Sequence, residues 1–510
     1  MVKSIIGAID QIAQENGQFV AYDELGVVHT YHDLKIASDR IATYLLQQDL
    51  PADAPIMIYG GQQFEMIASF LGSVKAGHAY IPVDVNSADE RLLDILEIGQ
   101  PAAVIAVDDL PIKIAAIPVI TNEALANVMN TAVALPILPT VDHDQDFYII
   151  FTSGTTGKPK GVQINHQNLL SFVNWMLSDE FGFKQQQCVL SQPPYSFDLS
   201  VMDWAPTLVS GGILKALPKT IADDFKQLFA TLPQLNLNIW VSTPSFADVA
   251  LLDPEFNEIN NPHLQRFLFC GEALTSTTAQ KLHERFPKAK IFNTYGPTEA
   301  TVAVTGIEIT EDILKNHTKL PIGFVKADTT ITIQDVDSHA TQPTGQAGEI
   351  VISGPSVSKG YLNNPEKTAV AFTTVEGQPA YRTGDLGMLD EQGLLHYQGR
   401  SDFQIKLHGY RIELEEVAQV LQHSQWIEQA VSVPRYDQDG KVKQLLAIVV
   451  AKKNDFDKPI LLTNAIKAEL KDIMMPYMMP SRFIYRESLP MTANGKTDLK
   501  TLIAEVNGNA

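Results

Sequence analysis

Phe147-Tyr-Ile-Ile-Phe151 is an apolar run, and Thr152-Ser-Gly-Thr-Thr-Gly-Lys-Pro-Lys-Gly161 follows it directly. The apolar run predicts a buried β-strand, and the polar stretch predicts a loop at the end of that strand. Glycines in such a loop allow close backbone approach, while its hydroxyls, its N–H groups, Lys158 and Lys160 can bind phosphate oxygens. It is not a Walker A loop, because Pro159 follows Lys158. A polar turn without a ligand is the alternative interpretation.

Apolar runs and helical patterns alternate along roughly the first 320 residues. Further strands are expected at 54–59, 102–107, 239–241, 266–269 and 291–294, and a helix is expected at 63–75. Several of these strands lead into loops rich in Gly, Pro, Ser or Thr. The alternation predicts an α/β fold, in which parallel strands present ligand-binding loops at their ends.

The sequence changes character twice after residue 320. Short strands at 330–334, 348–352, 387–389 and 395–397, separated by Gly, Asn and Asp turns, predict a β-rich subdomain at about 320–400. A compact α+β unit of about 100 residues begins at Phe403. Its elements are expected at 414–421 (helix), 430–433 and 445–450 (strands) and 461–474 (a helix that ends before Pro476).

Composition excludes several classes of protein. The 510 residues are 45% hydrophobic, which suffices for more than one packed core. Lys and Arg total 38 against 59 Asp and Glu, and the net charge of −21 argues against a nucleic-acid-binding protein. No apolar run approaches the roughly 18 residues of a membrane span, and no signal-peptide core follows Met1. Because only Cys188 and Cys270 occur, we expect no disulfide framework and a reducing compartment. Together these observations predict a cytoplasmic protein that does not insert into a membrane.

Six segments resemble, in order, the core motifs of adenylate-forming enzymes, the superfamily of acyl-CoA synthetases, luciferases and nonribosomal peptide synthetase adenylation domains. The segments are Thr152 to Gly161, Asn293-Thr-Tyr-Gly-Pro-Thr-Glu299, Tyr381-Arg-Thr-Gly-Asp385, Gly399-Arg-Ser-Asp-Phe-Gln-Ile-Lys406, Gly409-Tyr-Arg-Ile-Glu413 and Asn494-Gly-Lys496. The match extends over residues from about 20 to 500. It implies an ATP-dependent, AMP-forming ligase with a large N-terminal domain (residues 1–401), a hinge at Asp402 and a small mobile C-terminal domain (residues 403–510).

The resemblance assigns ATP or AMP binding to residues of five motifs. They are Thr152, Ser153, Thr155, Thr156, Lys158, Asn293, Thr294, Tyr295, Gly296, Thr298, Asp385, Arg400 and Lys496. Asp385 is expected to accept hydrogen bonds from the ribose hydroxyls, and Tyr295 is expected to stack on adenine. A turn-capping aspartate and a core tyrosine are the alternatives, and an ordinary ion pair is the alternative for Arg400.

Two charged residues are expected to act at the reacting phosphates. The resemblance makes Glu299 the predicted Mg²⁺ ligand, since this hard cation prefers carboxylate and phosphate oxygens. Lys496 lies in an Asn-Gly turn, where most lysines are simply solvated. The resemblance instead places its ammonium group beside the α-phosphate, where it stabilises negative charge in the transition state. Lys496 is therefore the predicted catalytic residue.

Three further stretches are similar to the stand-alone branch of the superfamily that activates D-alanine for teichoic and lipoteichoic acid modification of the cell wall. They are Phe197-Asp-Leu-Ser-Val-Met-Asp203, Phe269-Cys-Gly-Glu272 and Gln404-Ile-Lys-Leu-His-Gly-Tyr-Arg411. The similarity implies that ATP and D-alanine give D-alanyl-AMP and pyrophosphate. The D-alanyl group then passes to the phosphopantetheine thiol of a D-alanyl carrier protein. We expect a monomeric enzyme.

Three residues are expected to select the substrate. The ammonium group of an amino acid needs a carboxylate partner in an apolar pocket, and Asp198, among apolar neighbours, supplies one. Capping of the following helix is the alternative role of Asp198. Cys270 stands where many relatives carry glycine, so its side chain is expected to shape the space beside the substrate Cα and to favour D-alanine over L-alanine. Val302 either completes the methyl pocket or simply packs.

The resemblance implies that the C-terminal unit rotates between the two half-reactions. Asp402 is the expected hinge, and an ordinary residue in a rigid linker is the alternative. After rotation, the segment around Lys406 and Gly409 would face the active site, where Gly409 leaves room for the phosphopantetheine arm.

Residues 403–510 contain 14 Lys and Arg against 13 Asp and Glu, so the net negative charge belongs entirely to the rest of the chain. An acidic carrier is therefore expected to dock on the C-terminal unit, with Arg435, Lys441 and Lys443 as a candidate patch.

Three other functions are open at this point. The chain could adenylate L-alanine or glycine, it could be an acyl-CoA synthetase with coenzyme A as acceptor, or it could bind AMP without catalysis. The presence of Lys496, Glu299 and Asp385 together argues against the non-catalytic function. Asp198 argues against plain fatty or acetic acids, which carry no ammonium group.

Overall fold

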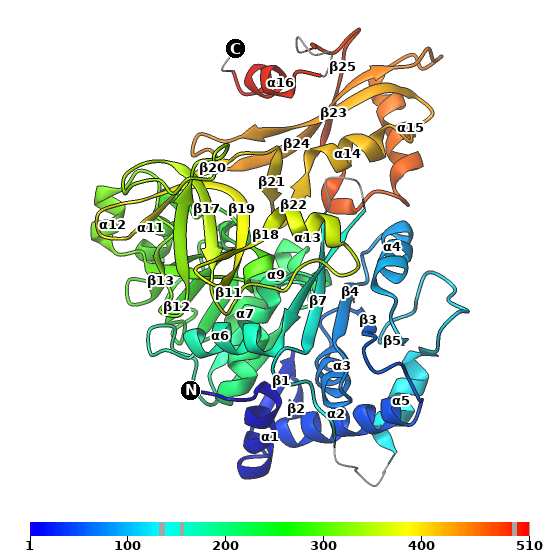
Figure 1. Cartoon of the computed structure of the whole chain (residues 1–510), viewed down its shortest axis with the longest axis vertical. Coiled ribbons are helices and arrows are strands. Elements are labelled where there is room, and N and C mark those ends of the chain that lie inside the picture. Colours follow the sequence, from blue (N-terminus) through cyan, green and yellow to red (C-terminus); the bar gives the residue numbers. More distant parts are fainter. Residues whose placement is uncertain (132–137, 154–157, 492–496, 509–510) are drawn as a thin grey trace. The chain divides into compact units, whose positions relative to one another are not determined.

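The computed structural model describes residues 1–131, 138–153, 158–491 and 497–508 (Figure 1). The chain divides into two compact units. The first comprises Met1–Val85, Ile98–Phe151 and Gly161–Ser401, and the second comprises Asn86–Glu97, Thr152–Lys160 and Asp402–Ala510. Asp402 thus begins the C-terminal segment of the second unit, and its action as a hinge stays a prediction.

A six-stranded sheet contains β7, the strand that precedes the segment predicted to bind phosphate (residues 152–161, called the phosphate loop below). Its order is β6-β5-β3-β4-β7-β8. The bounds are β3 Ile56–Gly60, β4 Tyr80–Asp84, β5 Ala103–Ala106, β6 Val119–Ile120, β7 Asp146–Thr152 and β8 Lys160–Asn165. The pairings of β3 with β4 and β5, of β4 with β7 and of β5 with β6 are parallel, as the α/β alternation predicts.

A nine-stranded sheet forms the other large layer of the first unit, in the order β15-β14-β13-β12-β11-β9-β10-β1-β2. The bounds are β1 Val20–Glu24, β2 Val27–Thr30, β9 Cys188–Ser191, β10 Ile213–Ala216, β11 Ile239–Ser242, β12 Arg266–Phe269, β13 Lys290–Tyr295, β14 Thr305–Glu308 and β15 Phe324–Val325. Its side chains alternate between two cores, as period-2 strands require. In β11, Ile239 and Val241 join one core, whereas Trp240 joins the other.

One hydrophobic core contains side chains of both large sheets and of the helices α1, α2, α3, α6 and α7. The first seven helices of the described chain are α1 Ile5–Glu15, α2 Tyr31–Leu46, α3 Phe64–Lys75, α4 Asp89–Gly99, α5 Asn122–Asn130, α6 His166–Met176 and α7 Leu199–Ser210. The second core packs shorter helices on the nine-stranded sheet. The shorter helices are α8 Lys219–Ala222, α9 Phe225–Thr231, η1 Leu232–Leu235, α10 Pro244–Ala250, α11 Ser276–Arg285 and α12 Glu311–Asn316.

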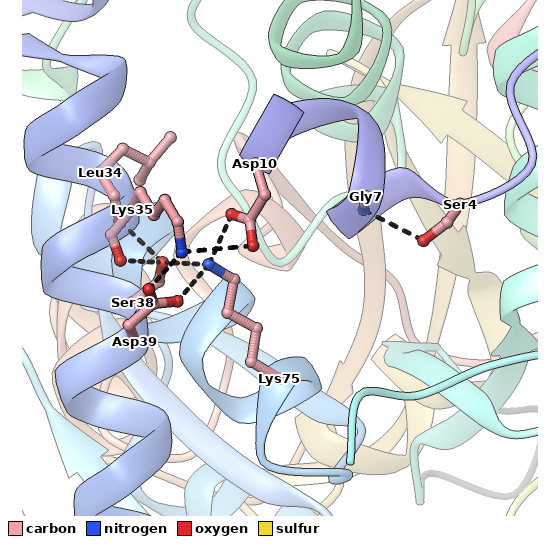
Figure 2. Close-up of polar contacts among 8 residues, drawn as sticks. All are labelled: Ser4, Gly7, Asp10, Leu34, Lys35, Ser38, Asp39 and Lys75. Carbon is pink, nitrogen blue, oxygen red and sulfur yellow. Dashed lines mark hydrogen bonds and ion pairs between the residues drawn. The ribbon is translucent and has the colours of Figure 1, made fainter. Parts of the chain in front are cut away.

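A buried group of charges joins α1, α2 and α3 (Figure 2). The Lys75 ammonium group lies 2.6 Å from Asp39 and 2.7 Å from Asp10, and Lys35 lies 2.5 Å from Asp39. Lys75 and Asp39 are almost fully buried, at 1% and 2% side-chain exposure. The two positive and two negative charges balance, which is the condition under which ionised groups are tolerated in a protein interior.

The β-rich subdomain consists of antiparallel strands in the order β16-β17-β19-β18, with β20 also paired to β19. Its elements are β16 Thr330–Gln334, β17 Gly348–Ser353, α13 Pro365–Ala371, β18 Phe372–Val375, β19 Gln378–Leu389 and β20 Leu395–Arg400. β19 is much longer than the segment 387–389 expected from the sequence, because Tyr381-Arg-Thr-Gly-Asp385 belongs to the same strand. This motif lacks the apolar alternation that identifies a strand.

Besides most of α4, the second unit contains two small sheets and the C-terminal helices. Its elements are β21 Gln404–Leu407, β22 Tyr410–Glu413, α14 Leu414–Leu421, β23 Ile427–Tyr436, β24 Val442–Ala451, α15 Pro459–Leu470, η3 Pro476–Met478, β25 Arg482–Tyr485 and α16 Leu499–Val506. The helix expected at 461–474 ends four residues early, at Leu470. Ile473, Met474 and Met475 instead pack as irregular chain on the core of this unit.

Candidate active site

Asp385 lies in an irregularity of the β-rich sheet. In the pairing of β17 with β19, Glu349 faces Leu386 and Val351 faces Arg382, so that Ile350 alone stands opposite the three residues 383–385. Such a bulge bends the strand and re-aims side chains. Thr383 Oγ1 fixes it by donating to the Ile350 carbonyl at 2.7 Å and accepting the Asp385 N–H at 3.0 Å.

Two neighbours hold the buried Asp385 carboxylate. Arg400 is its direct cross-strand partner on β20, and the guanidinium group donates to Oδ1 at 2.7 Å. The hydroxyl of Tyr295, the last residue of β13, donates to Oδ2 at 2.6 Å. Burial and the negative charge of Asp385 hold the pKa of Tyr295 well above its usual value, so the phenol stays protonated and acts as the donor.

Asn293 and Thr294 fasten the end of β13 to its surroundings. Asn293 Nδ2 donates to the carbonyl of Pro321 at 2.8 Å. Thr294 Oγ1 donates to the carbonyl of Phe269 at 2.8 Å and thereby joins the ends of β13 and β12. The end of β13 carries residues assigned to the nucleotide, and Cys270, assigned to the substrate, follows β12. The hydrogen bond of Thr294 therefore joins the two strand ends from which these residues come.

Glu299 lies in the short turn η2 (Thr298–Ala300) and is fully buried. Its Oε1 accepts a hydrogen bond of 2.8 Å from the hydroxyl of Tyr361, and its carbonyl accepts the N–H of Ser358 at 2.8 Å. A buried, hydrogen-bonded carboxylate in a motif predicted to bind phosphate suits Mg²⁺, which binds one or two carboxylates together with substrate phosphates. Within the described ranges no group of three or more His, Cys, Asp or Glu could hold a metal by protein ligands alone.

The two residues that follow η2 have a strained backbone. Thr301 and Val302 have φ angles of +59° and +68°, which are unusual for β-branched residues. The N–H of Ala303 donates to the carbonyl of Thr301 at 2.8 Å, which closes a tight γ-turn around Val302. Gly296 packs directly on this turn, since a Cβ there would lie 2.6 Å from the Cα of Ala303. Backbone strain of this kind concentrates at functional sites.

The residues assigned to the substrate lie in neighbouring segments. The Cys270 Sγ lies 3.7 Å from the Val302 carbonyl, and both residues are buried. A Cβ on Gly271 would lie 3.4 Å from the ring of Phe197, which immediately precedes Asp198. Asp198 is 7% exposed and stands at the N-cap of α7, but its side chain makes no capping hydrogen bond. The alternative role of Asp198 as a helix cap is therefore wrong.

The phosphate-loop residues that the structure describes belong to the second unit. Ser153 Oγ donates to the carbonyl of Arg411 at 2.8 Å. Thr152 Oγ1 is buried and has no hydrogen-bond partner in the described part of the chain. Lys158 is exposed, and a 2.7 Å hydrogen bond to Glu97 raises its pKa. Thr155, Thr156 and Lys496 lie outside the described residues.

Two supporting residues were not anticipated from the sequence. Glu349 accepts the N–H of Gly384 at 2.9 Å and so holds the turn before Asp385, and Tyr361 holds Glu299. Glu349 lies in a segment predicted only as a strand, and Tyr361 lies in none of the six motifs. The glycines beside them, Gly348 and Gly360, were the available signal, since each allows close approach of another chain segment.

Comparison with known proteins identifies the family. The AMP-binding enzyme family matches residues 9–362, and the AMP-binding enzyme C-terminal domain matches residues 416–496. The chain belongs to the AMP-binding enzymes. This AMP-binding enzyme is 58% identical to the D-alanine–D-alanyl carrier protein ligase of Lactiplantibacillus plantarum, over 99% of this chain and 100% of that protein. It is 52% identical to the ligase of the same name from Streptococcus agalactiae, again over 99% of this chain and 100% of the relative.

Solved structures confirm the predicted fold of this AMP-binding enzyme. An NRPS protein containing adenylation and PCP domains, bound to a vinylsulfonamide inhibitor, is 26% identical with a TM-score of 0.82, over 99% of this chain and 84% of that one. An adenylation domain of Vibrio cholerae, in complex with glycyl-adenosine-5'-phosphate, is 24% identical with a TM-score of 0.80, over 98% and 96%. Among the residues that the structure describes, no helix has both the length and the hydropathy needed to cross a membrane.

Proposed function

We propose that this AMP-binding enzyme is a D-alanine–D-alanyl carrier protein ligase that serves the D-alanylation of teichoic acids. The observation that carries the proposal is full-length identity of 52–58% to ligases of that name. The Asp385, Tyr295 and Arg400 cluster supports it independently, because it provides a buried carboxylate at the place where the family motifs expect ribose. The enzyme is proposed to act in the cytoplasm as a monomer.

In the first half-reaction, a carboxylate oxygen of D-alanine attacks the α-phosphorus of ATP. The new O–P bond gives D-alanyl-AMP, and the bond to the β-phosphate breaks to release pyrophosphate. Asp385 and Arg400 hold the ribose, the ring of Tyr295 lies against adenine, and Gly296 and Thr298 meet the phosphates together with the loop from Thr152 to Lys158. Positioning of this kind replaces a bimolecular encounter with a pre-oriented one.

Charge handling falls to a few placed groups, because the first unit is acidic. Glu299 would hold Mg²⁺, which supplies electrostatic stabilisation of the phosphate oxygens when bound. Lys496 is the proposed catalytic residue, whose ammonium group stabilises the negative charge that develops between the carboxylate and the α-phosphate.

The substrate residues are proposed to read three features of D-alanine. Asp198 is proposed to pair with the ammonium group, and its burial at the start of α7, beside Phe197, supports this role. Cys270 and Val302 border the Cα and methyl group. Their mutual contact of 3.7 Å supports a shared wall.

In the second half-reaction, the carrier thiol attacks the carbonyl carbon of D-alanyl-AMP. A thioester bond forms, the mixed anhydride breaks, and AMP leaves. Rotation about Asp402 is proposed to bring the strands around Lys406 and Gly409 to the site. Lys406 lies on β21, and Gly409, with φ of +83°, lies in the tight connection to β22. Arg435, Lys441 and Lys443 of the β23–β24 hairpin are the proposed docking patch for an acidic carrier.

The deciding experiment is ATP–pyrophosphate exchange with D-alanine, L-alanine and glycine, on the wild type and on Cys270→Ala. We expect strong preference for D-alanine in the wild type and a reduced D/L ratio in the variant. Preference for L-alanine or glycine would contradict the proposal. A thioester assay that offers the carrier and coenzyme A separately excludes the acyl-CoA synthetase if only the carrier is loaded.

A further inference from the structure

Tyr361 lies outside the six motifs, yet its side chain contacts two of them. Its hydroxyl donates to Oε1 of Glu299 at 2.8 Å and lies 3.4 Å from the hydroxyl of Tyr381, the first residue of the segment that ends at Asp385. Tyr361 and Tyr381 are 5% and 2% exposed, and Glu299 is fully buried. A hydrogen bond in such buried surroundings is electrostatically stronger than one in water, because the local dielectric constant is low.

The main chain fixes Tyr361 independently of Glu299. The N–H of Leu362 donates to the carbonyl of Gly161 at 2.7 Å, and Tyr361 forms an antiparallel bridge with Val162. Both of these partners belong to β8, the strand that leaves the phosphate loop. The ring of Tyr361 packs edge-on against Phe372, with centroids 5.3 Å apart. The direction of the hydroxyl is therefore set by packing, before any contact with Glu299 is counted.

The backbone of Glu299 is held at its carbonyl by the N–H of Ser358, but this bond leaves the direction of the side chain open. The turn η2 is three residues long and is followed by Thr301 and Val302 in the left-handed region. Such a segment does not by itself select one side-chain rotamer of a long carboxylate. The tyrosine hydroxyl supplies a second point of attachment, at the carboxylate itself.

We propose that Tyr361 is a positioning residue, which fixes the orientation of the Glu299 carboxylate toward the metal ion of the ATP complex. The inference rests on the proposed role of Glu299 as the metal ligand. It predicts that the Tyr361 hydroxyl controls metal affinity and leaves recognition of the amino acid unchanged.

The test uses Tyr361→Phe, which removes one oxygen atom and keeps the ring. Mn²⁺ binding to the enzyme with α,β-methylene-ATP is measured by electron paramagnetic resonance, without turnover. The Mg²⁺ concentration for half-maximal pyrophosphate exchange is measured in parallel. We expect the dissociation constant of Mn²⁺ and the half-maximal Mg²⁺ concentration each to rise about tenfold, the effect of losing a hydrogen bond to a charged group. KM for D-alanine is expected to stay unchanged. Tyr31→Phe is the matched control, because its buried hydroxyl donates to the Gly212 carbonyl at 2.8 Å, far from Glu299 in the sequence and on α2.

Two further variants separate this inference from the proposed function. If Glu299→Gln weakens Mn²⁺ binding and Tyr361→Phe does not, the positioning role is overturned and the metal role of Glu299 stands. If Glu299→Gln leaves Mn²⁺ binding unchanged, both fail. If the double variant Tyr361→Phe/Glu299→Gln binds Mn²⁺ no more weakly than Glu299→Gln alone, the inference is supported. If Tyr361→Phe has a lower melting temperature than the control, Tyr381→Phe is used instead, because its hydroxyl contacts that of Tyr361. The dissociation constant of Mn²⁺ is then expected to rise about threefold, and an unchanged constant overturns the inference.

Discussion

The hydroxyl of Tyr295 and the carboxylate of Asp385 meet at 2.6 Å, although 90 residues separate them in the sequence. Arg400 occupies the other carboxylate oxygen. We expect Asp385→Asn to raise KM for ATP at least tenfold, roughly the worth of a charged hydrogen bond, and to leave KM for D-alanine within about twofold. Asp390→Asn, in an exposed turn of the same subdomain, is the control. Steady-state pyrophosphate exchange measures both constants, and equal effects of the two variants would contradict the ribose role.

Lys496→Ala is expected to lower the rate constant of adenylation by about 10²–10³, the cost of removing a group that stabilises transition-state charge. Lys500→Ala, four residues further on in the exposed first turn of α16, removes the same charge from the same region and is expected to keep the wild-type rate. A Lys496→Ala enzyme within threefold of the wild type would instead favour a protein that binds AMP without using this lysine.

Asp198→Asn is expected to raise KM for D-alanine by about tenfold or more, because the substrate ammonium group loses its charged partner, while KM for ATP stays constant. Asp198 makes no capping bond, so the loss of a helix cap would not account for this change in KM. Asp224→Asn is the contrasting variant, because Asp224 does cap α9 through the N–H of Gln227 at 3.1 Å. A rise in KM for D-alanine in both variants would remove the argument for recognition by Asp198.

Lys75→Met is expected to destabilise the fold by about 3 kcal/mol, because Asp39 stays buried and, among the described residues, keeps Lys35 as its one ion-pair partner. Urea unfolding provides the measurement. Lys219→Met removes an exposed lysine, 2.6 Å from Asp223, and is expected to cost less than about 1 kcal/mol. Similar losses in the two variants would show that the buried cluster has no special weight.

His166 predicts a pH dependence of stability. Its Nε2 accepts the N–H of Ile5 at 3.3 Å, which requires the neutral imidazole, and burial lowers its pKa below 6.5 despite the nearby carboxylate of Asp142. A depressed histidine pKa stabilises the fold above pH 6.5, and that contribution is lost as the pH falls below this value. His166→Gln should therefore show a smaller decrease of melting temperature between pH 7 and about pH 5.5 than the wild type. Parallel curves would refute the assignment.

Elements with a regular pattern were predictable from the sequence. The bounds expected for β12, β16 and α14 agree with the structure, because β12 is a short apolar run after Arg266, and β16 and α14 have regular periods of 2 and 3.6. The end of α15 was not predictable, because the apolar residues after Leu470 serve the core equally well in irregular chain. Local pattern carries no information about that choice.

The site shows the same division. Motifs identified the residues that meet at Asp385, but nothing in the sequence places Glu349 under Gly384 or Tyr361 against Glu299. These contacts depend on pairings between strands and loops distant along the chain, and each is decided by tertiary packing. The roles assigned to the individual site residues stay predictions.

The bulge at residues 383–385 makes this part of the gene intolerant of small insertions and deletions. Side chains of a strand alternate between faces, so loss of a single residue such as Gly384 would turn Asp385 toward the opposite face and away from Tyr295 and Arg400. Substitutions elsewhere in β19 change one contact each. Length changes here would disrupt the proposed nucleotide site while leaving most of the sheet able to form, so we expect this segment to tolerate substitutions better than changes of length.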